Sequence, residues 1–321
     1  MKDGMSRRRF LASTAVVAGG LYGVSRLGSG KKHRKIRQRR ADNQLEKGLA
    51  VVHGDDPRAM AHKAIEALGG MDKLVRKGDV VVVKPNMTWA DRGPEYATNT
   101  NPEVVAAVVE MCLAAGAAKV KVFDHTISPN PRPAYEGSGI QAAAEKAGAD
   151  VVYVNPDRFC MIQIPDGKRL NEWAFYEDCI YEDRCDVLIN VPATKHHGTS
   201  RLSMGLKNAF GMVGLERGNL HQGIHENIAD LHRVVRVDLT ILDAFRILLR
   251  NGPYGGRLQD VSNSPKDARR VVASVDPVAV DAYGSTLYGF QPSDIGFVKE
   301  SHEAGHGEMD FKKNGVEEFT V

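Results

Sequence analysis

Short apolar runs alternate with amphipathic segments along most of this chain. The clearest apolar run is 79–84, a β-branched stretch typical of a strand buried on both faces of a parallel sheet. Helical spacing follows over 102–115, with Asn101 as the capping residue, Pro102 in the first turn and Gly116 at the end. This alternation predicts an α/β fold with a mainly parallel sheet and helices on both faces.

The same pattern assigns the other elements. The predicted strands are 48–52, 119–123, 151–154, 185–191, 237–242 and 271–275, and the predicted helices are 58–68, 140–147, 226–234 and 278–287. Residues 156–178 interrupt the alternation of strands and helices. The turn sequence Pro165-Asp166-Gly167 predicts a hairpin in a small antiparallel insertion. The body, 45–321, suits one large domain or two closely joined ones.

The first 30 residues have the composition of an export signal. Ser6-Arg7-Arg8-Arg9-Phe10-Leu11 precedes the modestly apolar run 12–24, which is too short and too rich in Gly and Ala to span a bilayer. Paired arginines before Phe and Leu favour the twin-arginine route over a Sec-type signal or an uncleaved anchor. We therefore expect a twin-arginine signal peptide over 1–30, handling by the twin-arginine translocation machinery and a periplasmic or extracytoplasmic location.

A basic segment, 31–44, follows the leader. Its core, Lys31 to Arg40, holds one apolar residue, Ile36, which favours a disordered linker over weak contact with a membrane surface or wall polymer. Residues 1–40 carry 12 of the 43 Lys and Arg side chains and one of the 40 acidic ones, so the remainder has a net charge of −8. An acidic body argues against nucleic-acid binding, although the whole chain has a pI of 8.6.

Polar and titratable residues follow one predicted strand after another. Ligands of such sheets bind beyond the carboxyl ends of the strands. The segments at these ends are Lys84-Pro85-Asn86-Met87, Asp124-His125, 192–198, Asp243 and Asp276. Their recurrence at the same end of successive strands predicts a site along that edge of the sheet.

The richest stretch is 195–225. His221 and His225 are four residues apart, so one helix face would present both to a metal, unless the helix begins only after Gly223. A surface or capping role is the alternative for this pair. His196 and His197 are neighbours on an extended segment, so they point in opposite directions and only one faces the site.

Three lysines form a second group of candidate site residues. Lys84, Lys195 and Lys207 would bind carboxylate or phosphate groups, or act as bases once desolvation lowers their pKa. An ordinary surface position is the alternative for Lys207, but the apolar surroundings of the Lys207-Asn208 step are not typical of a solvated face. Asp243 and Asp276 would ligate a divalent metal, orient a histidine or cap a helix.

These considerations define a candidate site. The catalytic candidates are Lys207, His196, His197 and Asn208, the substrate-binding candidates are Lys84, Asn86 and Lys195, and the metal-ligand candidates are His221, His225 and Asp243. A divalent metal is a possible cofactor, whereas the spacing of the four cysteines fits no iron–sulfur cluster. Cys112 is expected in the core, and Cys179 and Cys185 would form a disulfide if oxidised outside the cell.

In combination and order, the motifs over about 48–290 resemble the family of the domain of unknown function numbered 362. The resemblance is carried by Lys84-Pro85-Asn86, 100–105, Gly116-Ala117, Lys195-His196-His197, Leu206-Lys207-Asn208 within 203–211, His221, Asp243 and 275–281. The resemblance implies a protein of a family that is found widely in bacteria and archaea and whose activity is largely unassigned, and this chain lacks the ferredoxin-like segment that some members add. Gly205-Leu206-Lys207, followed by a glycine and His221, is loosely similar to the nickel-pincer lactate racemases, where Lys and His serve a cofactor and proton transfer.

Three functions fit these observations. The first is an exported enzyme, an oxidoreductase or isomerase, with metal- or cofactor-dependent redox or proton-transfer chemistry on a small anionic substrate. The second is a non-catalytic extracytoplasmic protein that binds an anionic ligand or a metal. The third is a metal-dependent ester hydrolase using Asp243 and Asp276, which ranks lower because the chain has no G-x-S-x-G nucleophile motif.

Overall fold

The computed structural model describes residues 34–90 and 92–321, and Lys35–Val321 form one compact unit. The predicted signal peptide lies outside the described residues. Among the residues that are described, no helix has the length and apolar character needed to cross a bilayer.

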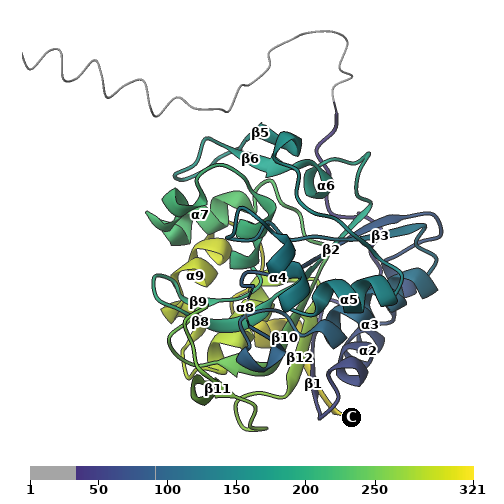
Figure 1. Ribbon diagram of the computed structural model, residues 1–321, viewed down its shortest axis with the longest axis vertical. Helices are drawn as coiled ribbons and strands as arrows, with labels where there is room; N and C mark the ends of the chain where they lie inside the picture. The colour runs from purple at the N-terminus through teal and green to yellow at the C-terminus, as the bar shows by residue number, and fades with distance from the viewer. Residues whose placement is uncertain (1–33, 91) are drawn as a thin grey trace, which may run out of the picture. The chain divides into compact units, whose positions relative to one another are not determined.

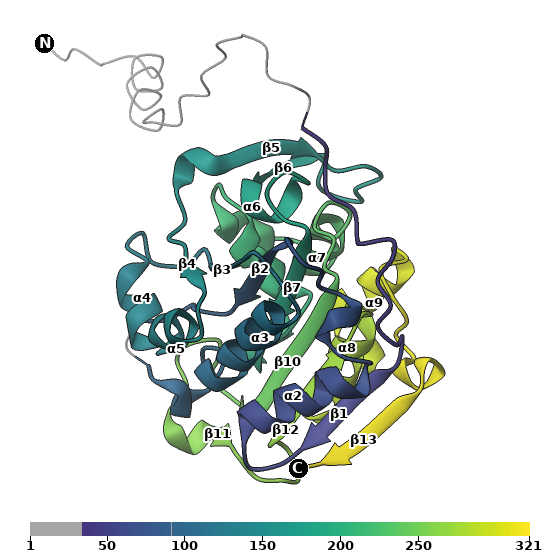
Figure 2. The same ribbon diagram turned by 90° about the vertical axis from the view of Figure 1, so that its right-hand side faces the viewer.

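The unit is built on a mixed, mostly parallel sheet (Figures 1 and 2). Its strands and those of the small hairpin are β1 (Leu49–His53), β2 (Val80–Pro85), β3 (Lys119–Val122), β4 (Asp150–Val151), β5 (Phe159–Gln163), β6 (Glu172–Tyr176), β7 (Val187–Val191), β8 (Ala193–His197), β9 (Arg201–Ser203), β10 (Leu239–Leu248), β11 (Val261–Ser262), β12 (Arg270–Ser274) and β13 (Val316–Thr320). The main order is β13-β1-β12-β10-β7-β2-β3-β4, with β12 antiparallel to both of its neighbours. The strands from β10 to β4 run parallel, so their carboxyl ends share one edge.

Helices cover both faces of this sheet, as the sequence predicts (Figure 2). They are α2 (Pro57–Ala67), α3 (Pro102–Ala114), α4 (Arg132–Gly137), α5 (Ile140–Lys146), α6 (Glu177–Ile180), α7 (Ile224–Leu231), α8 (Pro277–Thr286) and α9 (Gly296–Glu303), with the 3₁₀ segments η4 (Lys207–Met212) and η5 (Arg217–His221). In β2, Val82 packs with the core on the α7–α9 side, while Val81 and Val83 pack with the core under α2, α3 and α5. The β-branched run is therefore apolar on both sides because both of its faces are buried.

The predicted α/β class and the antiparallel insertion, formed by β5 and β6, are confirmed. The hairpin of β8 and β9 does not follow from the sequence pattern, because the predicted polar stretch after β7 turns out to be a strand paired with the long β10. The C-terminal strand β13, which pairs with β1, was likewise not expected.

The second half of the basic segment differs from the expected disordered linker. Ile36 forms a β-bridge with Tyr181, and buried Arg37 makes a 2.5 Å ion pair with Asp238. Arg40 pairs with Asp79 at 2.8 Å. Asp238 and Asp79 thus neutralise two arginines of the basic segment, and these ion pairs attach the described part of the segment to the domain.

The four cysteines are free thiols in this structure. Cys112 is buried in the core, as expected. Cys179 and Cys185 are not paired, and the Sγ atom of each donates to a backbone carbonyl instead, Tyr176 O for Cys179 and Val187 O for Cys185. The expected disulfide is therefore absent from this structure.

Candidate functional site

The carboxyl ends of β2 and β3 bring together the first pair of site residues. Lys84, at the end of β2, is fully buried, and its Nζ lies 2.7 Å from Asp124 Oδ1. The other oxygen of Asp124 accepts a 2.6 Å hydrogen bond from the backbone N–H of Met87. Burial lowers the pKa of Lys84, and the neighbouring carboxylate opposes that effect.

A segment after β9 closes over this pair. Gly205 and Leu206 donate their backbone N–H groups to the buried carboxylate of Asp281 on α8, at 2.7 and 2.8 Å. A Cβ on Gly211 would collide with Asp124 Oδ1 and Lys84 Nζ, so only glycine permits η4 to approach so closely. The segment 205–211 is thus fixed in place at both ends.

Asn208 connects the strand ends within this segment. Its Oδ1 accepts from Lys84 Nζ at 2.7 Å, and its Nδ2 donates to Asn190 Oδ1 at 2.8 Å. Asn190 in turn donates to the carbonyl of Gly205 at 2.8 Å. With every polar atom of Asn208 engaged, we interpret it as a residue that positions Lys84 rather than as a proton donor or acceptor in a reaction.

Lys195, in β8, is the second buried lysine. Its Nζ donates to Asn86 Oδ1 at 2.7 Å and to the carbonyl of Thr98 at 2.5 Å. Burial lowers its pKa to about 7, and the charge of Lys207 acts in the same direction. We call Lys84, Lys195 and Lys207, with the bonded side chains of Asn86, Asp124 and Asn208, the lysine cluster.

Lys207 differs from the other two lysines in its partners. Its Nζ lies 4.7 Å from the centroid of the Phe210 ring, and no hydrogen-bond acceptor among the described residues holds it. The side chain is 9% exposed, and burial together with the charges of Arg217 and Lys84 lowers its pKa to about 7. It therefore offers an unengaged amine that is close to half neutral at pH 7.

Two histidines lie next to Lys207. The rings of His197 and His221 stack with centroids 5.6 Å apart, and burial and the Lys207 charge lower the pKa of both. His197 Nδ1 accepts from the backbone N–H groups of Thr199 and Ser200, so Nε2 carries the proton of its neutral ring. His221 Nδ1 faces the carbonyl of Gly218 at 3.2 Å, which makes Nδ1 the donor and leaves Nε2 as an acceptor.

Positive charge exceeds negative charge in this region. Lys84, Lys195, Lys207 and the partly buried Arg217 are four basic groups, and Asp124 is the one carboxylate of the described residues that pairs with a lysine of the cluster. Within the part of the chain that the structure describes, Arg217 donates to backbone carbonyls alone, those of His125, Thr126 and Phe210. Burying such a surplus is costly unless an anion neutralises it.

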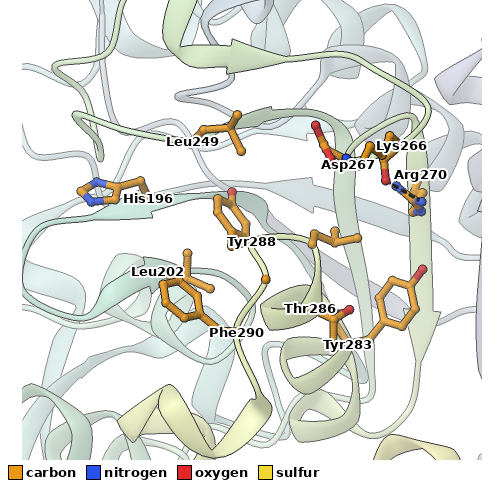
Figure 3. A pocket seen from close by; sticks show the side chains of 12 residues that line it. His196, Leu202, Leu249, Lys266, Asp267, Arg270, Tyr283, Thr286, Tyr288 and Phe290 are labelled. Atoms are coloured by element: carbon orange, nitrogen blue, oxygen red, sulfur yellow. Dashed lines mark hydrogen bonds between the residues drawn. The ribbon is translucent and has the colours of Figure 1, made fainter.

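His196 lies on the other side of β8, as strand alternation requires. Its Nδ1 accepts from the backbone N–H of Gly252 at 3.2 Å, and the residue borders a hollow that contains none of the cluster lysines (Figure 3). The structure therefore places His196 apart from Lys207, and His197 is the member of the pair that faces the cluster.

The predicted metal ligands are not grouped around one point in the described residues. Gly223, with a φ of 78°, separates η5 from α7, so His221 and His225 do not share a helix face. The ring of His225 packs instead on Phe297, with centroids 6.4 Å apart. Within the described ranges, no group of three or more His, Cys, Asp or Glu side chains is arranged to hold a metal ion.

The two aspartates that the sequence places after strands have structural roles, and Asp243 lies within the long β10 instead of at its end. Asp243 accepts from the backbone N–H groups of Asn101 and Phe245, at 2.7 and 3.1 Å, and thereby joins the start of α3 to β10. Asp276 caps α8 through the N–H groups of Val278 and Ala279. Their arrangement fits the capping alternative, and it does not support a hydrolase that uses both around one metal.

The sequence reasoning did not assign roles to Asp124, Arg217, Asn190 or Asp281. Asp124 was visible as a polar residue directly after a strand, and that signal was enough to place it at the edge. Asp281 lies in the middle of a helix that is buried on all sides, so a lone acid in an apolar helix was the available signal. Asn190 stands inside the apolar run of β7 and gave a similar signal.

Comparisons with known proteins relate this chain to a solved structure, a relative and a family. The lactate racemase apoprotein from Thermoanaerobacterium thermosaccharolyticum aligns with 79% of this chain at a TM-score of 0.43 and 11% identity, and the alignment spans 61% of that protein. That similarity says nothing about chemistry. The thylakoid-associated protein sll1697 of Synechocystis is 28% identical over 239 residues, which are 72% of this chain and 70% of that protein. Residues 81–286, more than half of the chain, match a family described as "Domain of unknown function (DUF362)", and the protein therefore belongs to that family.

Proposed function

We propose that this chain is an exported enzyme that binds a small anionic substrate at the lysine cluster and moves a proton with Lys207. The observation that carries the proposal is the state of Lys207: a buried amine with a pKa lowered to about 7, no hydrogen-bond acceptor among the described residues, and further cations around it.

Anion binding is the first step of the proposal. Lys84 and Lys195 are held by acceptors of the chain, so they contribute positive charge, while Lys207 has donors free for a ligand. His197 Nε2 supplies a neutral donor beside it. A carboxylate or phosphate group therefore finds a cationic environment that is already built, which limits the reorganisation needed on binding.

Proton transfer is the second step. A base works best when its pKa is close to the working pH, and at pH 7 Lys207 is close to half neutral. The neutral amine of Lys207 takes the proton, and the negative charge of the bound substrate then stabilises the ammonium that results. This ammonium returns a proton to the substrate, and His221 Nε2 is a second acceptor on the same side.

The chemistry that fits best is removal of a proton next to a carboxylate, as in isomerisation or racemisation of a small acid. If a redox cofactor binds, it supplies the electron transfer, and the same lysine and histidines supply the proton movement. Capture of an anion without chemistry is the second candidate, because the charge surplus alone supports it.

Exchange of carbon-bound hydrogen tests the reaction. The full chain is incubated in D₂O with small 2-hydroxy and 2-oxo acids, and deuterium at the carbon next to the carboxylate is followed by NMR. The proposal expects Lys207→Met to abolish exchange, whereas Lys63→Met, a surface lysine on α2, leaves it unchanged. Exchange that persists in Lys207→Met contradicts the assigned role, and binding without exchange supports the capture protein.

Export rests on Ser6-Arg7-Arg8-Arg9-Phe10-Leu11 and is tested separately. Replacing Arg7 and Arg8 with lysine keeps the charge but removes the paired guanidinium groups. We expect the full-length variant to stay in the cytoplasm of a host with a twin-arginine system, while the unaltered chain reaches the extracytoplasmic fraction. Equal export of the two chains contradicts this part of the proposal.

A further inference from the structure

A hollow of about 630 Å³ lies on the face of β8 that carries His196 (Figure 3). This volume falls in the range of roughly 300–1,000 Å³ that is usual for small-molecule sites. It is bordered by β8, β9, the end of β10, the start of β12 and the segment that ends α8. The lysine cluster does not contribute to it, so the proposed function leaves this hollow unexplained.

Apolar and aromatic side chains supply six of the twelve residues that line the hollow. They come from separate elements and comprise Leu202, Leu249, Tyr283, Leu287, Tyr288 and Phe290. Leu287 and Tyr288 pack behind the wall on a small buried cluster of Ala244, Ile247 and Ala268, which fixes their positions. The hydroxyl of Tyr288 reaches Thr194 of β8 at 3.3 Å. The wall is therefore a preformed surface suited to an apolar ligand body.

The charged residues that line the hollow lie at one end of it. Figure 3 shows Arg270, Lys266 and Asp267 together on the same side as Tyr283, with His196 at the opposite end. Asp267 accepts from Ser262 at 3.3 Å, and its charge offsets that of the exposed Lys266. Arg270 then leaves this end with a net charge of +1.

Arg270 has no acidic partner. Its terminal nitrogens donate to the carbonyls of Ala268 and Lys266, at 3.0 and 3.1 Å, and its Nε is buried without a hydrogen-bond partner. No Asp or Glu oxygen of the described residues lies within ion-pair distance of it. The guanidinium thus contacts carbonyls and the Tyr283 hydroxyl but no carboxylate of the described residues, and a carboxylate is the ligand group that best matches it.

We infer that this hollow binds an amphipathic monocarboxylate, with the carboxylate at Arg270 and the apolar body along Leu202, Tyr288 and Phe290. One negative charge matches the net charge at that end. The apolar body explains why the rest of the wall carries aromatic and aliphatic side chains. The inference does not depend on the proposed function, because the two sites use opposite faces of β8.

Calorimetric titration of the full chain with octanoate tests the inference, with octanol and octylamine as probes of the same length. We expect saturable binding of octanoate that is at least about tenfold tighter than that of either other probe, since a hydrogen bond to a charged group is worth more than a factor of ten. No saturable octanoate binding, or equal binding of octanoate and octylamine, overturns the inference.

Matched variants locate the binding. Arg270→Gln should weaken octanoate binding about tenfold or more and leave octanol unaffected. Arg269→Gln is the control, because it removes the same charge from the neighbouring residue, which pairs with Asp55 outside the hollow. Equal affinities of the two variants overturn the inference.

A second variant covers the case in which Arg270→Gln does not fold. Thr286 is exposed on the rim, so Thr286→Trp fills the hollow without changing its charge. Binding of octanoate should be lost in this variant while the thermal unfolding midpoint stays that of the unaltered chain. Unchanged octanoate affinity in a folded Thr286→Trp protein overturns the inference.

Discussion

The ion pair between Lys84 and Asp124 should be a large contributor to the stability of the site, and Asp124→Ala isolates it. Lys84 is fully buried and Asp124 is 2% exposed, so the variant leaves an ammonium group without its counter-charge. Removing one partner of a buried pair typically costs about 3–5 kcal/mol. Loss of the acceptor for Met87 N–H adds roughly 1 kcal/mol.

Deprotonation of Lys84 sets an upper limit on the cost of the unpaired charge. Starting from an ordinary pKa of 10.5, neutralising the amine at pH 7 takes about 4.8 kcal/mol, at 1.36 kcal/mol per pH unit. Once the amine is neutral in the folded variant, the unfolded chain binds more protons than the folded one. The variant should therefore recover stability as the pH rises towards 10.5, by about 1.4 kcal/mol per unit.

Urea unfolding at pH 7 and pH 9, followed by circular dichroism, measures both effects. The matched control is the double variant Lys84→Met with Asp124→Ala, which replaces the pair by an apolar side chain and should recover most of the lost stability. A loss below 1 kcal/mol in Asp124→Ala would refute the reasoning. So would a double variant that is no more stable than the single one.

Three further predictions follow from the structure. Gly211→Ala places a Cβ against Lys84 and Asp124 and should lower the free energy of unfolding by roughly 1–3 kcal/mol, measured in urea; a neutral effect would show that η4 can shift. Because the folded-state pKa of Lys207 is lowered to about 7, the contribution of Lys207 to stability is complete above pH 10.5 and is lost as the pH falls to 7. Lys207→Met should therefore reduce the slope of the free energy of unfolding against pH between these values by about 1.4 kcal/mol per unit at most. Parallel plots of the free energy of unfolding against pH for the two proteins would contradict this. Arg37→Ala leaves Asp238 buried without its cation and should cost about 3–5 kcal/mol, and an unfolding midpoint equal to that of the unaltered chain would mean that the basic segment does not pack on the domain.

The elements that the sequence placed correctly are those with strong local patterns. The β-branched run of β2 and the capped start of α3 carry their signal within a few residues, so periodicity and capping suffice. The edge that gathers Lys84 and Lys195 also follows from strand order, because parallel strands end on the same side, whereas the position of Lys207 depends on the β8–β9 hairpin that the pattern did not predict.

The parts that could not be predicted depend on contacts between distant segments. The sequence shows that His196 and His197 point apart, but only the pairing of β8 with β10 decides which one meets Lys207. The spacing of His221 and His225 suggests one helix face, and a single glycine between them breaks it. Arg37 was expected in solvent because its partner, Asp238, lies about 200 residues later in the chain.

The titration of Lys207 tests the central claim most directly. Lysines labelled with ¹³C at Cε are followed by NMR from pH 5 to pH 11 in the full chain, and Lys207→Met assigns the signal by its disappearance. The account predicts a midpoint about 7 for this signal, and a higher midpoint when malonate is added, because a bound anion favours the charged amine. A midpoint near the ordinary value of 10.5, unaffected by malonate, would contradict the account.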